Sequence, residues 1–404
     1  MRKVESKKLW SAAAWRSFGS PSSVRPHKDY QSDAEAVALQ RRVPALPEVL
    51  LLALLVSVIF VAIVALLDDY AKRAAQAGDN RIYVELTGVI RQGDFSRVAV
   101  TPQFWGLPYA AAIVAKATSI SDLSAIVLVS IVASFVAVAL AYRLWGGWIA
   151  AFFAIISWDW MQRSLLGGAE PLFLALVFGA FLAARSERWL VAALLASLAT
   201  TVRPLGLLTL IALAVALILR REFQKLALAV IIGLLVGAAY VLPFAIALGN
   251  PLVNVEAYRS EAWAGESPIS WPLLSVVRGF ISNSGEPLAN KLKIGAWVAL
   301  TLAGVTAMIC TEGFRRFARE HLMEATFALL YLAMLFSYNS PRWNWAEFPR
   351  FVVPAIPFLL LALERWLPKH RALLWSAGAA SALLAAASAI NVRNALQQLG
   401  RLFG

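Results

Sequence analysis

Long apolar runs separated by short polar turns dominate this chain of 404 residues. The clearest runs cover 48–67, 122–142, 205–219, 226–248, 291–311, 322–338, 350–367 and 372–390, and shorter ones cover 106–118, 147–161, 170–184 and 189–201. Several reach the ~20 apolar residues that a helix needs to cross a bilayer core. Lipid offers no partner to free backbone polar groups, and a β-barrel would show alternating segments of about ten residues instead. The pattern predicts an all-α, polytopic membrane protein.

Basic turns predict how the helices are oriented. Turns 220–225, 312–321 and 368–371 are net basic, which is typical of cytoplasmic loops. The loops expected outside are 68–105, 249–290 and 339–349. Six apolar runs lie between loop 68–105, expected outside, and turn 220–225, expected in the cytoplasm. An odd number of crossings is needed to connect the two sides, so one of the six does not cross. The short run 106–118 fits a re-entrant or interfacial piece, so about eleven helices are expected to cross.

The chain divides into a tail, a membrane domain and a second tail. Segment 1–47 is basic and mixed with Pro, Ser and Gln, and no apolar core with a cleavage site follows it. It is therefore expected to be a flexible cytoplasmic tail and not a signal peptide. The transmembrane domain is expected to cover 48–390, and 391–404 to form a C-terminal tail.

Charge and cysteine content exclude several classes of function. The formal net charge of +13 suggests nucleic-acid binding, but much of the excess lies at predicted membrane edges, where orientation explains it. Cys310 is the single cysteine, which excludes an internal disulfide and a thiolate metal site. His27, His321 and His370 stand in basic flanks without metal-ligand spacing, so neither a metal centre nor a histidine triad is expected.

Acidic residues gather in the first external loop. Asp68 and Asp69 open it, and Asp79 begins a stretch that predicts an amphipathic helix along the membrane surface. The apolar face of this helix is Ile82, Leu86, Val89 and Ile90. Each acid also has a purely structural interpretation, because Asp68 and Asp69 follow a transmembrane helix and Asp79 suits a helix cap.

Further candidates stand at the ends of later runs. Glu170 lies between a glycine pair and Pro171 at the mouth of a run, where a carboxylate either caps the helix or faces a polar partner. Arg203 lies between two apolar runs, as a snorkelling anchor or an anion ligand. Arg342, Glu347 and Arg350 crowd the loop before the run 350–367. Arginines on the outer face are unusual, and they suit a phosphate, which a guanidinium binds with paired hydrogen bonds.

The order of these motifs resembles the GT-C glycosyltransferases over roughly residues 50 to 365. The motifs are DNRIY (79–83) with Gly93 further on, GLPYA (106–110), AEPLF (169–173), RPLG (203–206) and RFVVPAIP (350–357). Ala169 departs from the Ser or Thr that the family usually has. The resemblance implies inverting transfer of a sugar, mannose or a related hexose, from a polyprenyl-phosphate carrier to an acceptor hydroxyl. It also implies a bacterial inner membrane enzyme that works on the external face.

The resemblance favours Asp79 as the general base, because Tyr83 follows it, with Asp69 and Asp68 as alternatives. Glu170, Arg203, Arg342, Glu347 and Arg350 are then expected to bind substrate beside Tyr83. Partial desolvation is expected to raise the pKa of Asp79. Positive charge that stabilises the departing phosphate would come from arginine or from a divalent metal ion. The motifs require no other cofactor, and the expected partners are the lipid-linked donor, an acceptor that the residues do not identify, and membrane lipid.

Two other membrane functions suit part of the pattern. A transporter or flippase of lipid-linked sugars would show an inverted repeat with interrupted helices in both halves, and no such repeat is visible. An O-antigen ligase or polymerase would carry its largest external loop in the later half, where loop 249–290 lies.

Overall fold

The computed structural model describes residues 43–95, 101–262, 269–282, 287–339 and 347–403. The helices are α2 (Leu46–Leu67), α3 (Tyr70–Gln76), α4 (Asn80–Gln92), α5 (Gly106–Thr118), α6 (Asp122–Trp145), α7 (Gly147–Ile156), α8 (Trp158–Leu165), α9 (Ala169–Arg185), α10 (Trp189–Val202), η3 (Pro204–Gly206), α11 (Leu207–Leu219), α12 (Phe223–Leu248), α13 (Val253–Ala262), α14 (Leu274–Ser282), α15 (Leu288–Cys310), α16 (Glu312–Glu320), α17 (Leu322–Ser337), α18 (Phe348–Phe351), η5 (Val353–Ala355), α19 (Ile356–Ala362), η6 (Glu364–Trp366), α20 (Arg371–Ala389) and α21 (Val392–Phe403). The predicted all-α class is confirmed: the only β structure in the described ranges is an isolated bridge between Ile269 and Tyr338.

Membrane-spanning helices are evident from length and composition. Five described helices are long and apolar enough to cross a bilayer, namely α2, α6, α12, α20 and the Asn290–Cys310 part of α15. Helices α8 and α9 make a sixth candidate if they count as one broken span, and several shorter apolar helices accompany them. The chain is therefore a polytopic membrane protein, and the number of eleven crossings stays a prediction.

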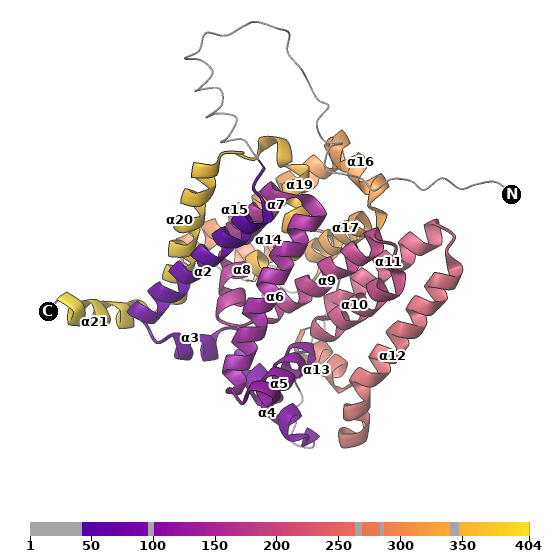
Figure 1. Ribbon diagram of the computed structural model, residues 1–404, viewed down its shortest axis with the longest axis horizontal. Helices are drawn as coiled ribbons and strands as arrows, with labels where there is room; N and C mark the ends of the chain where they lie inside the picture. The colour runs from indigo at the N-terminus through magenta and orange to yellow at the C-terminus, as the bar shows by residue number, and fades with distance from the viewer. Residues whose placement is uncertain (1–42, 96–100, 263–268, 283–286, 340–346, 404) are drawn as a thin grey trace, which may run out of the picture. The chain divides into compact units, whose positions relative to one another are not determined.

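The helices run between two chemically different ends. At one end, Arg185 at the close of α9 pairs with Glu324 at the start of α17, and Trp145 at the close of α6 donates to the same carboxylate. Arg220 lies over the ring of Trp189 close by, so the basic turn between α11 and α12 belongs to this end. At the other end lie α4, α5 and α13, in the lower part of Figure 1, while α16 lies in the upper part. The turns predicted to be cytoplasmic thus gather away from the acidic first loop.

The predicted amphipathic helix forms as α4, and its apolar face packs against protein. Leu86 is buried in a small cluster with Trp105, Phe244 and Val253, which belong to other parts of the chain. Ile82 and Ile90 pack on the edge of the same cluster. The face that the sequence assigned to the membrane surface is thereby used to hold the first loop against α5 and α12.

Two predicted runs are broken in the structure. The run 350–367 is divided into α18, η5 and α19, because Pro349, Pro354 and Pro357 interrupt the helical hydrogen bonds. The run 147–161 is divided at Ser157 between α7 and α8, and α8 then meets α9, which covers the separate run 170–184, at an angle of 102°. At the α8–α9 junction Gly167 has φ +98°, which favours glycine, and the neighbouring Asn80 side chain fills the space that a Cβ would occupy.

The segment 391–404, predicted as a tail, is mostly helix α21. Asp68 at the end of α2 holds it, because the carboxylate accepts from the Asn391 N–H and from the Asn394 side-chain amide, both at 2.8 Å. Arg73 pairs with the same carboxylate at 2.6 Å. Of the predicted N-terminal tail, residues 1–42 lie outside the described residues.

Candidate active site

A fully buried carboxylate, Glu170, forms the centre of the polar cluster. It lies in the first turn of α9, where it makes no cap, and its side chain is only 1% exposed. Glu170 Oε1 accepts from Arg203 Nη1 at 2.5 Å and from Arg350 Nε. Arg203 comes from the end of α10 and Arg350 from α18, so this one oxygen joins three segments of the chain. Removing a carboxylate from water is costly unless cations pair with it, and here two do.

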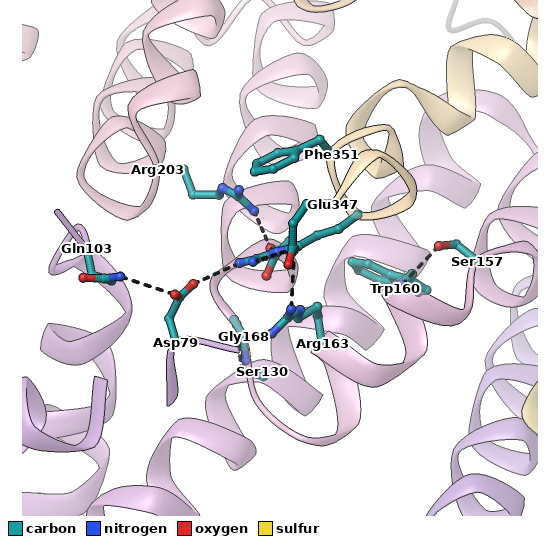
Figure 2. Close-up of polar contacts among 12 residues, drawn as sticks. Asp79, Gln103, Ser130, Ser157, Trp160, Arg163, Gly168, Arg203, Glu347 and Phe351 are labelled. Carbon is teal, nitrogen blue, oxygen red and sulfur yellow. Dashed lines mark hydrogen bonds and ion pairs between the residues drawn. The ribbon is translucent and has the colours of Figure 1, made fainter. Parts of the chain in front are cut away.

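Asp79 contacts the same cluster from the first loop. It stands at the N-terminus of α4, but its carboxylate makes no capping hydrogen bond. Asp79 Oδ2 accepts from Arg350 Nη2 at 3.1 Å, and Oδ1 accepts from Gln103 Nε2 at 3.3 Å (Figure 2). The capping interpretation of Asp79 is therefore not what the structure shows, since its oxygens face other side chains.

The Arg350 guanidinium controls the ionisation of Asp79. Burial alone raises the pKa of this carboxyl, but the charge and hydrogen bond of Arg350 outweigh burial, and Arg163 adds to them. The net result is a pKa of Asp79 below its ordinary value. The expectation from sequence of a raised pKa is wrong in this state of the protein, because it considered desolvation without the paired arginine.

Glu347 and Arg163 close the cluster. Glu347 Oε2 accepts from Arg350 Nη1 at 3.1 Å and lies 3.9 Å from Arg163 Nη2. Figure 2 shows the Glu347 side chain pointing toward Arg163. Three carboxylates, Asp79, Glu170 and Glu347, thus face three guanidinium groups, Arg163, Arg203 and Arg350. The formal charge of this set is zero.

The break between α8 and α9 is fixed by buried hydrogen bonds. Asn80 Nδ2 donates to the carbonyl oxygens of Ala74 and Leu166, both at 2.7 Å. The N–H of Gly168 donates to Ser130 Oγ on α6 at 3.1 Å. These bonds tie the α8–α9 junction to the first loop and to α6, and so position Arg163 on one side of the break and Glu170 on the other.

Two aromatic side chains pack around the charges. The Phe351 ring lies 5.3 Å from the Arg203 guanidinium carbon and 5.8 Å from that of Arg350. Tyr83 is buried on α4, one turn after Asp79, and burial followed by the nearby Asp79 and Glu170 charges raises the pKa of its phenol. Tyr83 is thus neutral at physiological pH and has an O–H to donate.

The structure brings together most of the candidates that the sequence predicts. Asp79, Glu170, Arg203, Glu347 and Arg350 meet in one cluster beside Tyr83. Asp68 has other partners, which also hold its pKa at about 2 against the raising effect of burial. Asp69 caps α3 by accepting from the Lys72 N–H. Arg342 lies outside the described residues.

Two members of this cluster, Arg163 and Gln103, were not predicted from the sequence. Arg163 was overlooked because it follows a predicted span as an ordinary flanking cation. The only available signal was its closeness to the glycine pair of GGAEPLF. No group of three or more His, Cys, Asp or Glu side chains in the described part of the chain is arranged to hold a metal ion.

Fold and site together define a polytopic all-α membrane protein with a buried cluster of paired carboxylates and arginines. No protein-family model and no curated protein matches the chain. Two solved structures are similar in fold, with a TM-score of 0.47 each. One is ArnT from Cupriavidus metallidurans in the apo state, at 17% identity over 79% of this chain and 60% of that chain. The other is the same protein bound to undecaprenyl phosphate, at 15% identity over 87% and 62%. The chain thus spans less than two thirds of the length of these proteins.

Proposed function

We propose that the protein is a GT-C-type membrane glycosyltransferase that moves a sugar from a polyprenyl-phosphate carrier to an acceptor hydroxyl. Asp79 is the general base, and the arginine cluster binds the donor phosphate. The proposed sugar is mannose or a related hexose, and the proposed location is the external face of a bacterial inner membrane. The acceptor is a glycan, lipid or protein that presents a free hydroxyl.

The observation that carries this proposal is the ion pair between Asp79 and Arg350. The pair places a carboxylate, 31% exposed in its side chain, against a buried cation at the end of the bundle away from the basic turns. Sugar transfer from a phosphate needs a base for the acceptor proton and positive charge for the leaving group. Asp79 and Arg350 supply these two groups in contact with each other.

Each bond and proton in the proposed transfer is accounted for as follows. The acceptor oxygen attacks the anomeric carbon, the bond from that carbon to the phosphate oxygen breaks, and Asp79 takes the hydroxyl proton. The electron pair of the broken bond stays on the phosphate, which leaves as polyprenyl phosphate with one more negative charge. Attack opposite to the leaving group inverts the anomeric centre.

Donor binding changes the ionisation of the base. A phosphate near Arg350 shares the guanidinium with Asp79 and weakens the contact that holds the pKa of Asp79 low. The desolvation that already acts on this carboxyl then raises its pKa and makes it a better base. The base is therefore activated only when the leaving group is in place.

Sugar transfer by the full chain in proteoliposomes tests the proposal. The donor is radiolabelled polyprenyl-phosphate mannose, and an envelope extract supplies acceptors. Asp79→Asn is expected to lower kcat by about 10² to 10⁴, the usual contribution of a general base. Asp69→Asn, which removes the charge but keeps an oxygen that can cap α3, is the matched control and is expected to retain transfer. Equal transfer by the wild type and Asp79→Asn would overturn the assignment of the base.

A further inference from the structure

Arg163 differs from the other two arginines of the cluster in how it is paired. Arg203 and Arg350 both donate hydrogen bonds to Glu170, and Arg350 also donates to Asp79 and Glu347. Within the described residues, the ion pair of Arg163 is a 3.9 Å approach to Glu347, beyond hydrogen-bonding distance. Its side chain is nevertheless only 15% exposed. A guanidinium that is largely out of water with its donors so little used is suited to receive an anion.

The first loop is shaped to leave room for this guanidinium. A Cβ at Gly78 would overlap Arg163 Nη1, and it would lie 2.7 Å from Arg163 Cζ. Gly78 also has φ +52°, which favours glycine, and a side chain at this position would have to displace the guanidinium. Asp79 follows directly in the chain. The Arg163 guanidinium therefore packs against the backbone at Gly78, next to the proposed base, and its charge helps to lower the pKa of the Asp79 carboxyl.

Glu347 is the most exposed carboxylate of the cluster. Its side chain is 36% exposed, against 1% for Glu170, and among the described residues it accepts one hydrogen bond, from Arg350, and makes the long contact to Arg163. Its carboxylate thus occupies the position between two guanidinium groups that a phosphate would bridge. Because its side chain reaches solvent, it can leave this position without burying a charge.

We propose that Arg163 is a phosphate ligand and that Glu347 occupies the phosphate position until the phosphate of a lipid-linked donor displaces it. This inference rests on the proposed function and deepens it. Arg163 and Arg350 would bridge the phosphate, Glu347 would turn to solvent, and Arg203 would stay with Glu170 as a fixed support.

Binding separates this inference from catalysis. The full chain in lipid nanodiscs is titrated with undecaprenyl phosphate, with the neutral alcohol undecaprenol and with inorganic phosphate. Arg163→Gln is expected to weaken undecaprenyl phosphate binding at least tenfold and to leave undecaprenol binding unchanged. Inorganic phosphate bound as tightly as the lipid phosphate would overturn the lipid assignment.

A glycine pair gives a matched control. Gly78→Ala is expected to weaken undecaprenyl phosphate binding about as much as Arg163→Gln, because the new methyl displaces the guanidinium. Gly93→Ala adds the same methyl at φ +73°, with no atom of the described residues within 4 Å of it. This control carries similar backbone strain without the overlap, and it is expected to bind like the wild type. Equal binding by Gly78→Ala and Gly93→Ala would overturn the role of Arg163.

Glu347→Gln provides a test that misfolding cannot imitate. Removing the competing carboxylate is expected to tighten undecaprenyl phosphate binding several-fold, and unchanged or weaker binding would overturn the displacement step. If the wild type transfers sugar and Arg163→Gln binds the lipid phosphate normally, only this inference fails. If the wild type neither transfers sugar nor binds undecaprenyl phosphate, the proposed function fails, and the inference fails with it.

Discussion

Arg350 Nη2 donates to Asp79 Oδ2 at 3.1 Å, although 271 residues separate the two in the chain. The first loop and the segment before α19 are thus joined at one guanidinium. The same guanidinium contacts Glu170 and Glu347 as well. Any anion that binds there has to compete with carboxylates that are already in place, so ligand binding and the ionisation of Asp79 are linked.

This linkage predicts two different acid limbs in the pH dependence of sugar transfer. In the free enzyme, Arg350 holds the pKa of Asp79 below its ordinary 3.8, so kcat/KM is expected to show no acid limb from Asp79 above about pH 5. In the donor complex, the phosphate shares Arg350 and the limb in kcat is expected at higher pH. Steady-state rates from pH 4 to 9 measure both profiles. A limb of kcat/KM near neutral pH would contradict the pairing.

The low pKa of Asp79 also affects how the stability of the fold depends on pH. Because the folded-state pKa of Asp79 lies below the unfolded value, its ion pair stabilises the fold above the unfolded pKa and loses that contribution as pH falls through the folded pKa. No loss from this group is therefore expected in the range where transfer is assayed. Loss of the Asp79 ion pair is therefore not expected to explain a fall in kcat in that range.

Replacement of the central carboxylate is expected to destabilise the protein strongly. Glu170→Gln leaves Arg203 and Arg350 without the negative charge with which both are paired, and breaking a buried ion pair costs about 3–5 kcal/mol. Thermal unfolding in detergent should show a clearly lower Tm. Glu222→Gln is the control, because its pair with Lys225 is about 40% exposed and is expected to contribute about 0–1 kcal/mol. Similar Tm values for both variants would contradict the buried pairing.

Replacement of Glu324, at the end of the bundle opposite the first loop, is expected to lower stability without lowering kcat. Glu324 accepts from Arg185 Nε at 2.6 Å and Nη2 at 2.8 Å, and from Trp145 Nε1 at 3.0 Å. Glu324→Gln is expected to lower Tm about as much as Glu170→Gln, since it also strands a partly buried arginine. Molecules that remain folded are expected to keep the wild-type kcat. A large fall in kcat at full folding would show that the two ends are coupled.

Replacement of Asp68 tests whether this residue holds helix α21 in place or acts as the general base. Its carboxylate holds Arg73, Asn391 and Asn394, so Asp68→Asn is expected to release α21 and to increase protease cleavage in that helix. Transfer per folded molecule is expected to stay within about twofold of the wild type, since Asp68 does not contact the cluster around Glu170. Limited proteolysis and a transfer assay on the same sample measure both. Intact α21 with abolished transfer would return Asp68 to the list of candidate bases.

The apolar pattern predicts the helices well wherever the run is uninterrupted. The run 122–142 became Asp122–Trp145, and 372–390 became Arg371–Ala389. It also separated the runs 147–161 and 170–184 at the α8–α9 junction, but it missed the break at Ser157 between α7 and α8. Hydropathy averages over such a break and records only a continuous apolar stretch.

The candidate site was predictable residue by residue but not as a network. Glu170 and Arg203 stand out because charge at the end of an apolar run is costly and needs a reason. Their pairing could not be predicted, since it depends on how α9, α10 and α18 approach one another. For the same reason the sign of the pKa shift of Asp79 was missed: desolvation follows from location, whereas the partner follows only from the fold.

The break between α8 and α9 also places one charged residue at the favourable end of each helix dipole. Arg163 lies in the last turn of α8, where the carbonyl ends of the peptide dipoles favour a cation. Glu170 lies in the first turn of α9, where the N–H ends favour an anion. A continuous helix would place both charges in its interior, where neither dipole end is available. By ending one helix and starting another within the apolar bundle, the chain gives each charge a favourable backbone field of its own, independent of any ligand.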